Sequence, residues 1–68
     1  MLIRTQDMNA IIDAIHVYRS YESIYGSTGE TESRILLGKY SSEGEATQAL
    51  DALENWLDSG SNAIFRMP

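Results

Sequence analysis

The segment Ser42–Leu57 constrains this chain more than any other stretch, because several independent signals there predict the same helix. Ser42 followed three residues later by Glu45 is a capping box, in which the hydroxyl accepts from the Glu45 N–H and the carboxylate reaches back to the Ser42 N–H. Gly60 can adopt the left-handed conformation that follows a last turn. The apolar residues in between recur at helical spacing and form one stripe: Ala46, Ala49, Leu50, Leu53, Trp56 and Leu57. The rest of the chain must supply the surface that this stripe buries.

Most of the remaining sequence favours short strands. β-branched and tyrosine residues are dense over Ile15–Tyr25 and alternate along it, which is typical of a pleated surface. A helix over Ala10–Tyr18, capped by Asp7 or Asn9, is the alternative for part of this stretch. Gly26–Glu30 holds two glycines and no apolar residue, which indicates a loop between two hairpin arms. The expected strands are Leu2–Gln6, Ala10–Asp13, Ile15–Tyr25, Thr31–Tyr40 and, at an edge, Ala63–Met67.

These elements follow the order β-β-β-β-α-β and predict an α+β fold. We expect one domain, residues 1–68, in which the helix packs on one face of an antiparallel sheet of four to five strands. Gly38, near the end of the fourth strand, predicts a bulge or a close backbone contact. A single helix leaves one sheet face uncovered, and that face is expected to serve self-association. It carries some of the tyrosines Tyr18, Tyr21, Tyr25 and Tyr40.

The length of the chain also points to self-association. A domain of 68 residues buries only about 60% of the surface that its unfolded chain exposes, so extra stabilisation is needed. The sequence has no cysteine for a disulfide and a single histidine, too few for a histidine-rich structural metal site. We therefore expect a dimer or a tetramer.

The opening MLIRTQD lacks the layout of a signal peptide, and no apolar run approaches the ~20 residues of a membrane span, so we expect a cytoplasmic protein without a membrane partner.

Acidic residues outnumber basic ones, ten to five, which gives a formal net charge of −5 at pH 7. Duplex nucleic acid needs a basic stripe, so it is not an expected partner. The charge permits a basic protein partner, although solubility is the simpler explanation. Asp51, Glu54 and Asp58 share one helix face and could hold a divalent cation, but an ordinary solvated face explains them better. No metal site is expected.

No pattern in the sequence predicts catalysis. His16 is the only imidazole, and no G-x-S-x-G nucleophile elbow accompanies it. The sequence has neither a Walker loop nor a G-x-G-x-x-G motif, and Gly26 and Gly29 are spaced for a hairpin turn. We expect a protein that is not an enzyme and uses no cofactor.

Cationic and aromatic side chains along the expected strands are the candidate binding residues. A guanidinium offers a planar fork for phosphate, and a tyrosine ring offers a face on which a nucleobase can stack. Symmetry in an oligomer could repeat a few such residues around a pocket. The alternative is that these cations pair with neighbouring acids at the surface, which contributes little. The candidates are Arg4, Tyr18, Arg19, Arg34, Lys39, Tyr40 and Arg66.

Three pieces of the sequence resemble a family of short uncharacterised proteins encoded by phages, prophages and plasmids of Firmicutes. The family opens with M-x-I-R-[ST]-Q-D, continues with an LG-x-Y-[ST] strand end that runs into an A-x-x-x-L helix, and closes with an aromatic-x-Met-Pro. This chain has MLIRTQD, LLGKYSSEGEATQALDALENWL and IFRMP in those places, about half of its length. Between Met8 and Ser33 it departs from the family, because its hairpin arms are longer and richer in tyrosine.

The resemblance implies a mobile genetic element as the setting and, for a protein of this size, a role against host defence. One such role is a sponge, an oligomer that sequesters a cyclic-nucleotide signal as anti-CBASS and anti-Thoeris proteins do. A second is an acidic inhibitor that docks on a basic groove of a host nuclease, as many anti-CRISPR proteins do. A third is a structural or regulatory phage protein. The arginines and tyrosines favour the sponge, and the net charge favours the inhibitor.

Overall fold

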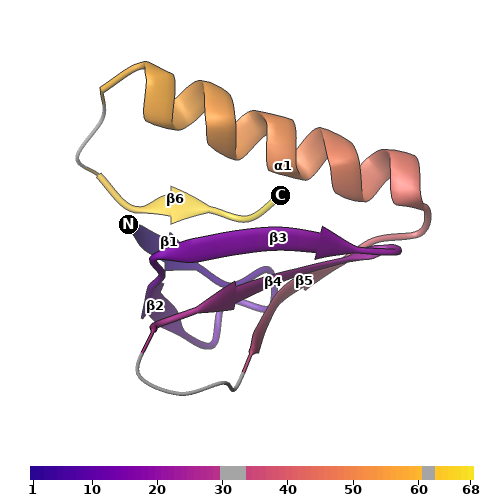
Figure 1. The fold of residues 1–68 in the computed structure, drawn as a ribbon, viewed down its shortest axis with the longest axis horizontal. Coiled ribbons are helices and arrows are strands. Elements are labelled where there is room, and N and C mark those ends of the chain that lie inside the picture. The colour runs from indigo at the N-terminus through magenta and orange to yellow at the C-terminus, as the bar shows by residue number, and fades with distance from the viewer. Residues whose placement is uncertain (30–33, 61–62) are drawn as a thin grey trace.

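The computed structural model of this protein describes residues 1–29, 34–60 and 63–68. One helix lies along one side of the molecule, over the strands (Figure 1). The described elements are β1 (Leu2–Arg4), β2 (Ile11–Asp13), β3 (His16–Ser20), β4 (Ser23–Ser27), β5 (Ile35–Lys39), α1 (Glu43–Asp58) and β6 (Phe65–Arg66). The α+β class is confirmed, and so are the strand at Ala10–Asp13 and the edge position of the last strand; the helical alternative for Ala10–Tyr18 is wrong.

The strands form two three-stranded sheets instead of the expected single antiparallel sheet. One has the order β2-β1-β6, with β1 antiparallel to β2 and parallel to β6; the other is the antiparallel sheet β3-β4-β5. The division occurs at two consecutive residues. The Ala14 N–H donates to Met1 O at 2.8 Å, whereas the Ile15 N–H donates to Ser27 O at 3.0 Å. The chain thus leaves the first sheet and enters the second within one peptide unit.

The expected single strand Ile15–Tyr25 is wrong, because the chain turns inside it. Tyr21 has a φ of 55° and, with Glu22, connects β3 to β4 in a tight hairpin. The expected loop therefore starts too early: Gly26 lies within β4. A Cβ on Gly26 would lie 3.0 Å from Leu37 Cδ1, so glycine here allows close packing and does not form a turn. The expected strand residues Thr31–Ser33 lie outside the described residues.

A bulge interrupts the pairing of β4 with β5, as Gly38 predicts. Ile24 pairs with Gly38 while Tyr25 pairs with Leu36, which leaves Leu37 as the extra residue. The close contact expected at Gly38 is also present. A Cβ there would lie 2.7 Å from the Tyr40 hydroxyl oxygen, so only glycine lets the Tyr40 ring lie against this strand.

The helix begins and ends almost as its signals predict. Ser42 is the N-cap and its Oγ accepts from the Glu45 N–H at 3.1 Å. The Glu45 carboxylate does not return to the Ser42 N–H: it accepts from the Ser41 N–H and hydroxyl, one residue further back. Gly60 has a φ of 75°, the left-handed conformation expected after the last turn.

The core lies where the helix meets both sheets. Phe65 of β6 packs against Trp56 of α1, with ring centroids 5.5 Å apart. Leu50 and Trp56 of the predicted stripe are only half-buried, and Leu57 is 45% exposed because it lies at the margin of the core. The buried apolar residues are Ile3, Ala14, Ile24, Leu37, Ala46, Ala49, Leu53, Phe65 and Met67.

Gln6, just after β1, connects the two sheets. Its backbone N–H donates to Leu37 O at 2.7 Å, and its side-chain Oε1 accepts from the Lys39 N–H at 2.8 Å. Its Nε2 donates to Pro68 O at 3.1 Å. One side chain therefore fixes the end of β1, the bulged strand β5 and the segment after β6 to one another.

The turn between β1 and β2 makes folding sensitive to acid. The Thr5 hydroxyl donates to Asp7 Oδ1 at 2.6 Å, and the Asn9 N–H donates to the same oxygen at 3.0 Å. These hydrogen bonds favour the charged carboxylate and lower the pKa of Asp7 below its ordinary value. Asp7 therefore stabilises the fold above the pKa that it has in the unfolded chain, and this contribution is lost as the pH falls through the lower, folded pKa.

We expect Asp7→Asn to lower the free energy of unfolding at about pH 7 and to have a progressively smaller effect as the pH falls and the native Asp7 carboxylate becomes protonated. Urea unfolding at a series of pH values measures this. Asp51→Asn is the control, because no described residue donates a hydrogen bond to that exposed helix carboxylate. An Asp7→Asn deficit that is the same at every pH would show that the turn needs the side chain but not its charge.

Candidate functional site

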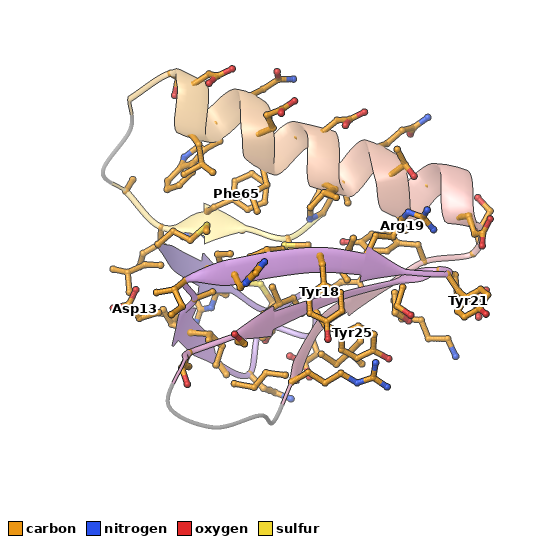
Figure 2. All side chains as sticks on the ribbon, viewed as in Figure 1. Asp13, Tyr18, Arg19, Tyr21, Tyr25 and Phe65 are labelled. Atoms are coloured by element: carbon orange, nitrogen blue, oxygen red, sulfur yellow. The ribbon has the colours of Figure 1, made fainter. Side chains whose placement is uncertain are left out.

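The outer face of the sheet β3-β4-β5 gathers aromatic and cationic side chains. Alternation along the strands places Tyr18, Tyr25 and Leu36 on the face away from α1, and Arg34 precedes Leu36 by two residues. Figure 2 shows Tyr18 and Tyr25 next to each other below β3, on the side of that strand away from the helix. Lys39 extends this face, since it pairs with Ser23. We call these five residues the tyrosine face: Tyr18, Tyr25, Arg34, Leu36 and Lys39.

The three strands bring the rings and the guanidinium into contact. The Tyr18 and Tyr25 rings are stacked, with centroids 5.9 Å apart and planes at 30°. The Arg34 guanidinium carbon lies 4.2 Å from the centroid of the Tyr25 ring. Such contacts contribute about 0.5–1.5 kcal/mol for an aromatic pair and about 0.5–1 kcal/mol for an exposed cation–π pair. They hold the groups in place, yet Tyr18 is still 37% exposed and Leu36 49% exposed. The face can therefore accept a planar ligand that carries negative charge.

The structure distributes the seven predicted binding residues over four places. Tyr18, Arg34 and Lys39 lie on the tyrosine face. Arg19 lies on the opposite face of β3, where its Nη1 donates to Tyr21 O at 2.8 Å and lies 3.9 Å from Glu43 Oε1. Tyr40 lies in a separate pocket. Arg4 and Arg66 are cross-strand neighbours in the other sheet. The tyrosine face therefore holds three of the seven, and no other surface holds more than two.

Arg4 and Arg66 form a second cationic place. They pair in register across the parallel strands β1 and β6, so two like charges stand side by side. Arg4 Nε is buried and has no hydrogen-bond partner among the described residues. Leu2 and Ile11, which flank this pair in the sheet, are exposed apolar residues. None of these four described residues has an aromatic ring on which a base could stack.

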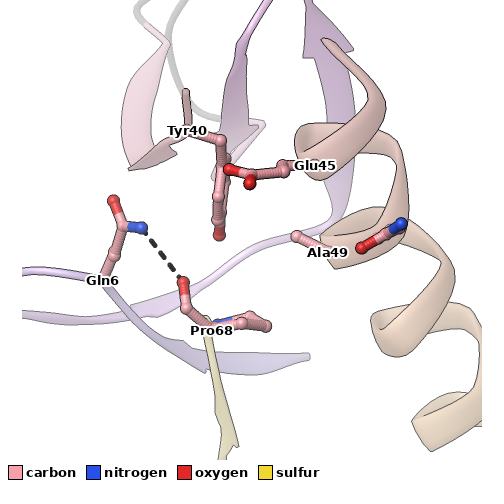
Figure 3. Close-up of a pocket in the computed structure, with 6 residues that line it drawn as sticks. Gln6, Tyr40, Glu45, Ala49 and Pro68 are labelled. Carbon is pink, nitrogen blue, oxygen red and sulfur yellow. Dashed lines mark hydrogen bonds between the residues drawn. The ribbon is translucent and has the colours of Figure 1, made fainter. Parts of the chain in front are cut away.

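A pocket lies between Tyr40 and the start of α1 (Figure 3). Its volume is about 450 Å³, and its lining contains one charged side chain, the Glu45 carboxylate. Burial raises the pKa of the Tyr40 phenol above its ordinary value, so the hydroxyl is protonated at neutral pH. The lining residues are Gln6, Tyr40, Glu45, Gln48, Ala49 and Pro68. An anionic ligand would find no positive charge in this pocket.

The Tyr40 hydroxyl is buried and has no hydrogen-bond partner among the described residues. An unmade buried hydrogen bond costs about 1–3 kcal/mol, so removing the hydroxyl is not expected to cost stability. We expect Tyr40→Phe to leave the free energy of unfolding unchanged or to raise it by about 1 kcal/mol. Urea unfolding of the two proteins tests this. A Tyr40→Phe protein that is less stable by about 1 kcal/mol would mean that the hydroxyl is hydrogen-bonded in solution.

The exposed side of α1 is strongly acidic. The helix contains no basic residue, and all five of its carboxylate side chains are exposed: Glu43, Glu45, Asp51, Glu54 and Asp58. The helix and the tyrosine face thus carry opposite charges on opposite sides of the sheet β3-β4-β5. In residues 1–29, 34–60 and 63–68, no three His, Cys, Asp or Glu side chains are placed together to hold an ion.

Sequence reasoning missed three residues that matter at these sites. The sequence indicates Tyr25 only as one of four tyrosines that could lie on the uncovered sheet face, and its pairing with Tyr18 becomes visible only once the turn at Tyr21 is known. Gln6 and Glu45 line the pocket, and no periodicity marks them for it. Their positions depend on contacts between distant segments, and the capping box at Glu45 is the only local signal.

Of the residues that the structure describes, none belongs to a helix long and apolar enough to cross a membrane. The chain matches no protein-family model, and comparisons with curated proteins and with solved structures find no similar protein.

Proposed function

We propose that this protein is a non-catalytic binding protein that sequesters a nucleotide on the tyrosine face. The carrying observation is the Tyr18–Tyr25 stack with the Arg34 guanidinium 4.2 Å from the Tyr25 ring. A ring face binds a nucleobase by stacking, and guanidinium and ammonium groups bind phosphate. The role that follows from the family resemblance is a phage-derived sponge for a cyclic-nucleotide immune signal in the host cytoplasm.

An open face supports an oligomeric sponge better than a monomeric one. Small-ligand sites bury most of the ligand, whereas Tyr18 and Leu36 are on an exposed sheet surface. A second copy with its tyrosine face opposite the first would enclose the ligand between two sets of rings and cations. Such a two-fold arrangement matches a cyclic dinucleotide, which itself has two bases and two phosphates. The proposal therefore includes a dimer or tetramer as the binding species.

Binding assays with matched arginine variants test this proposal. Isothermal titration against a panel of cyclic di- and trinucleotides should identify a ligand for the native protein. Arg34→Ala and Tyr18→Ala should each weaken its binding about tenfold or more, because each removes a contact of about 1–3 kcal/mol. Arg66→Ala is the control, since it removes the same charge from the other sheet.

Two outcomes would count against the nucleotide proposal. One is that no member of the panel binds while circular dichroism shows a folded protein. The other is that Arg34→Ala and Arg66→Ala weaken binding equally, which would indicate general charge attraction in place of a site. Sedimentation of the native protein with and without ligand should show the dimer or tetramer. A monomer in both samples would remove the enclosed site.

The acidic helix favours a second candidate function, an inhibitor that docks on a basic groove of a host defence nuclease. Five exposed carboxylates without a cation on α1 and a net charge of −5 would steer the protein toward a basic surface. This function predicts capture of a basic nuclease that weakens when Asp51, Glu54 and Asp58 are changed together to Asn, Gln and Asn. The nucleotide proposal predicts that the same variant still binds its ligand.

A further inference from the structure

We infer that the pocket between Tyr40 and α1 is a binding site for a guanidinium group, such as that of an arginine side chain. The site is separate from the tyrosine face and does not depend on the proposed nucleotide ligand. Three features carry the inference: the charge of the lining, the open hydrogen-bond acceptors and the aromatic wall.

The charge of the lining selects a cation. Glu45 is the only charged side chain among the six lining residues, and the acidic surface of α1 continues from it. The N-terminal end of a helix carries about half a positive charge, which opposes a cation. Glu43 and Glu45 in the first turn offset that charge, and no basic residue lies anywhere in α1.

The acceptors that face the pocket are not all used within the protein. Glu45 Oε2 accepts from Ser41, but Oε1 makes no hydrogen bond with a described residue. The same holds for the side-chain carbonyl of Gln48. Gln6, by contrast, uses Oε1 for the Lys39 N–H and Nε2 for Pro68 O, so it is a fixed wall of the pocket. Glu45 and Gln48 both line the pocket from α1, three residues apart and therefore on one helix face, and oxygen acceptors on one face match the fork of donors on a guanidinium.

The Tyr40 ring completes the site. In Figure 3 the ring is seen edge-on, so its faces point toward Gln6 on one side and toward Ala49 of the helix on the other. The ring lies against Gly38, where a Cβ would come within 2.7 Å of the hydroxyl oxygen, so glycine leaves the space that the ring occupies. A guanidinium favours an aromatic face over a point contact, because its plane can stack while its edge donates hydrogen bonds. About 450 Å³ is ample space for such a group.

An NMR titration of the full chain tests the site with three probes: the peptide acetyl-Gly-Arg-Gly-amide, its citrulline counterpart, and free argininamide. Citrulline has the shape of arginine without its charge. The arginine peptide should shift the backbone signals of Tyr40, Gln48 and Ala49, and the citrulline peptide should not. Argininamide distinguishes the source of the guanidinium. Binding as tight as that of the peptide points to a free small molecule, and tighter binding of the peptide points to a protein side chain.

Matched variants distinguish binding in the pocket from general attraction of the cationic peptide to the acidic protein. Glu45→Gln retains an oxygen for the Ser41 hydrogen bonds and should weaken the arginine peptide about tenfold. Asp58→Asn removes the same charge at the other end of α1 and should change the affinity by less than about twofold. Tyr40→Phe should bind as the native protein does, and Tyr40→Leu should lose binding. Equal effects of Glu45→Gln and Asp58→Asn, or equal shifts from the arginine and citrulline peptides, would overturn the site.

Discussion

Leu37→Ala is expected to lower the free energy of unfolding by about 3 kcal/mol, the usual cost of truncating a fully buried leucine. Leu37 is 1% exposed and contacts the core from β5, where Gly26 leaves room for it. A chain of 68 residues is stabilised by about 3–10 kcal/mol in total, so this loss removes between about a third and all of the stability. Urea unfolding followed by circular dichroism measures the difference.

The neighbouring residue provides the matched control. Leu36 lies in the same strand, has the same side chain and is 49% exposed on the opposite face of the sheet. Leu36→Ala should therefore cost less than about 1 kcal/mol, since about half of the residue's contact with water is already present in the folded state. Similar losses for the two variants would mean that the outer face is covered in solution, as it would be in the proposed oligomer.

Gln6→Ala is expected to cost about 2 kcal/mol, because the variant loses two hydrogen bonds that join separate segments. The native side chain accepts from the Lys39 N–H at 2.8 Å and donates to Pro68 O at 3.1 Å. The replacement leaves the Lys39 N–H without its partner. Amide hydrogen exchange at Lys39 is the direct measurement, and its protection should fall in the variant while that of the Ile24 amide changes only with global stability.

Gln48→Ala is the control for the Gln6 variant. Gln48 has a side-chain amide that lines the same pocket, is exposed on α1 and makes no hydrogen bond with a described residue. Alanine is a good helix former, so this substitution should leave stability unchanged or slightly higher. If the Lys39 amide stays protected in Gln6→Ala, the joint between the sheets does not depend on the glutamine side chain.

The hairpin at Tyr21 illustrates why part of the strand pattern was misread. Tight turns usually contain glycine, asparagine or aspartate, which tolerate a positive φ, but here a tyrosine has a φ of 55°. Ile15–Tyr25 therefore alternates like one continuous strand, with no local signal that it turns. Tyr21 is 77% exposed, so the surrounding structure and not its own packing sets the turn: Arg19 donates to its carbonyl at 2.8 Å.

The sequence indicates which residue types could bind a ligand, but not which of these residues lie together in the fold. Arginines and tyrosines can be read from the sequence, and Tyr18 and Arg34 do share a surface. Their grouping depends on which strands pair, and that also separates Arg4, in one sheet, from Arg34, which directly precedes a strand of the other. No local sequence pattern indicates which strands pair, because the paired residues Tyr25 and Leu36 are eleven positions apart.

The sequence by itself determined the helix, its caps and the α+β class. Ser42, Glu45 and Gly60 act within a few residues of where they stand, and helical hydrogen bonds connect residues four apart, so the evidence is local. Only the tertiary structure decided that the strands divide into two sheets and that β6 pairs parallel to β1, with Ile3 beside Phe65. A strand exposes donors and acceptors that any other strand can satisfy. Its partner is therefore chosen by burial of the shared core, which involves the whole chain at once.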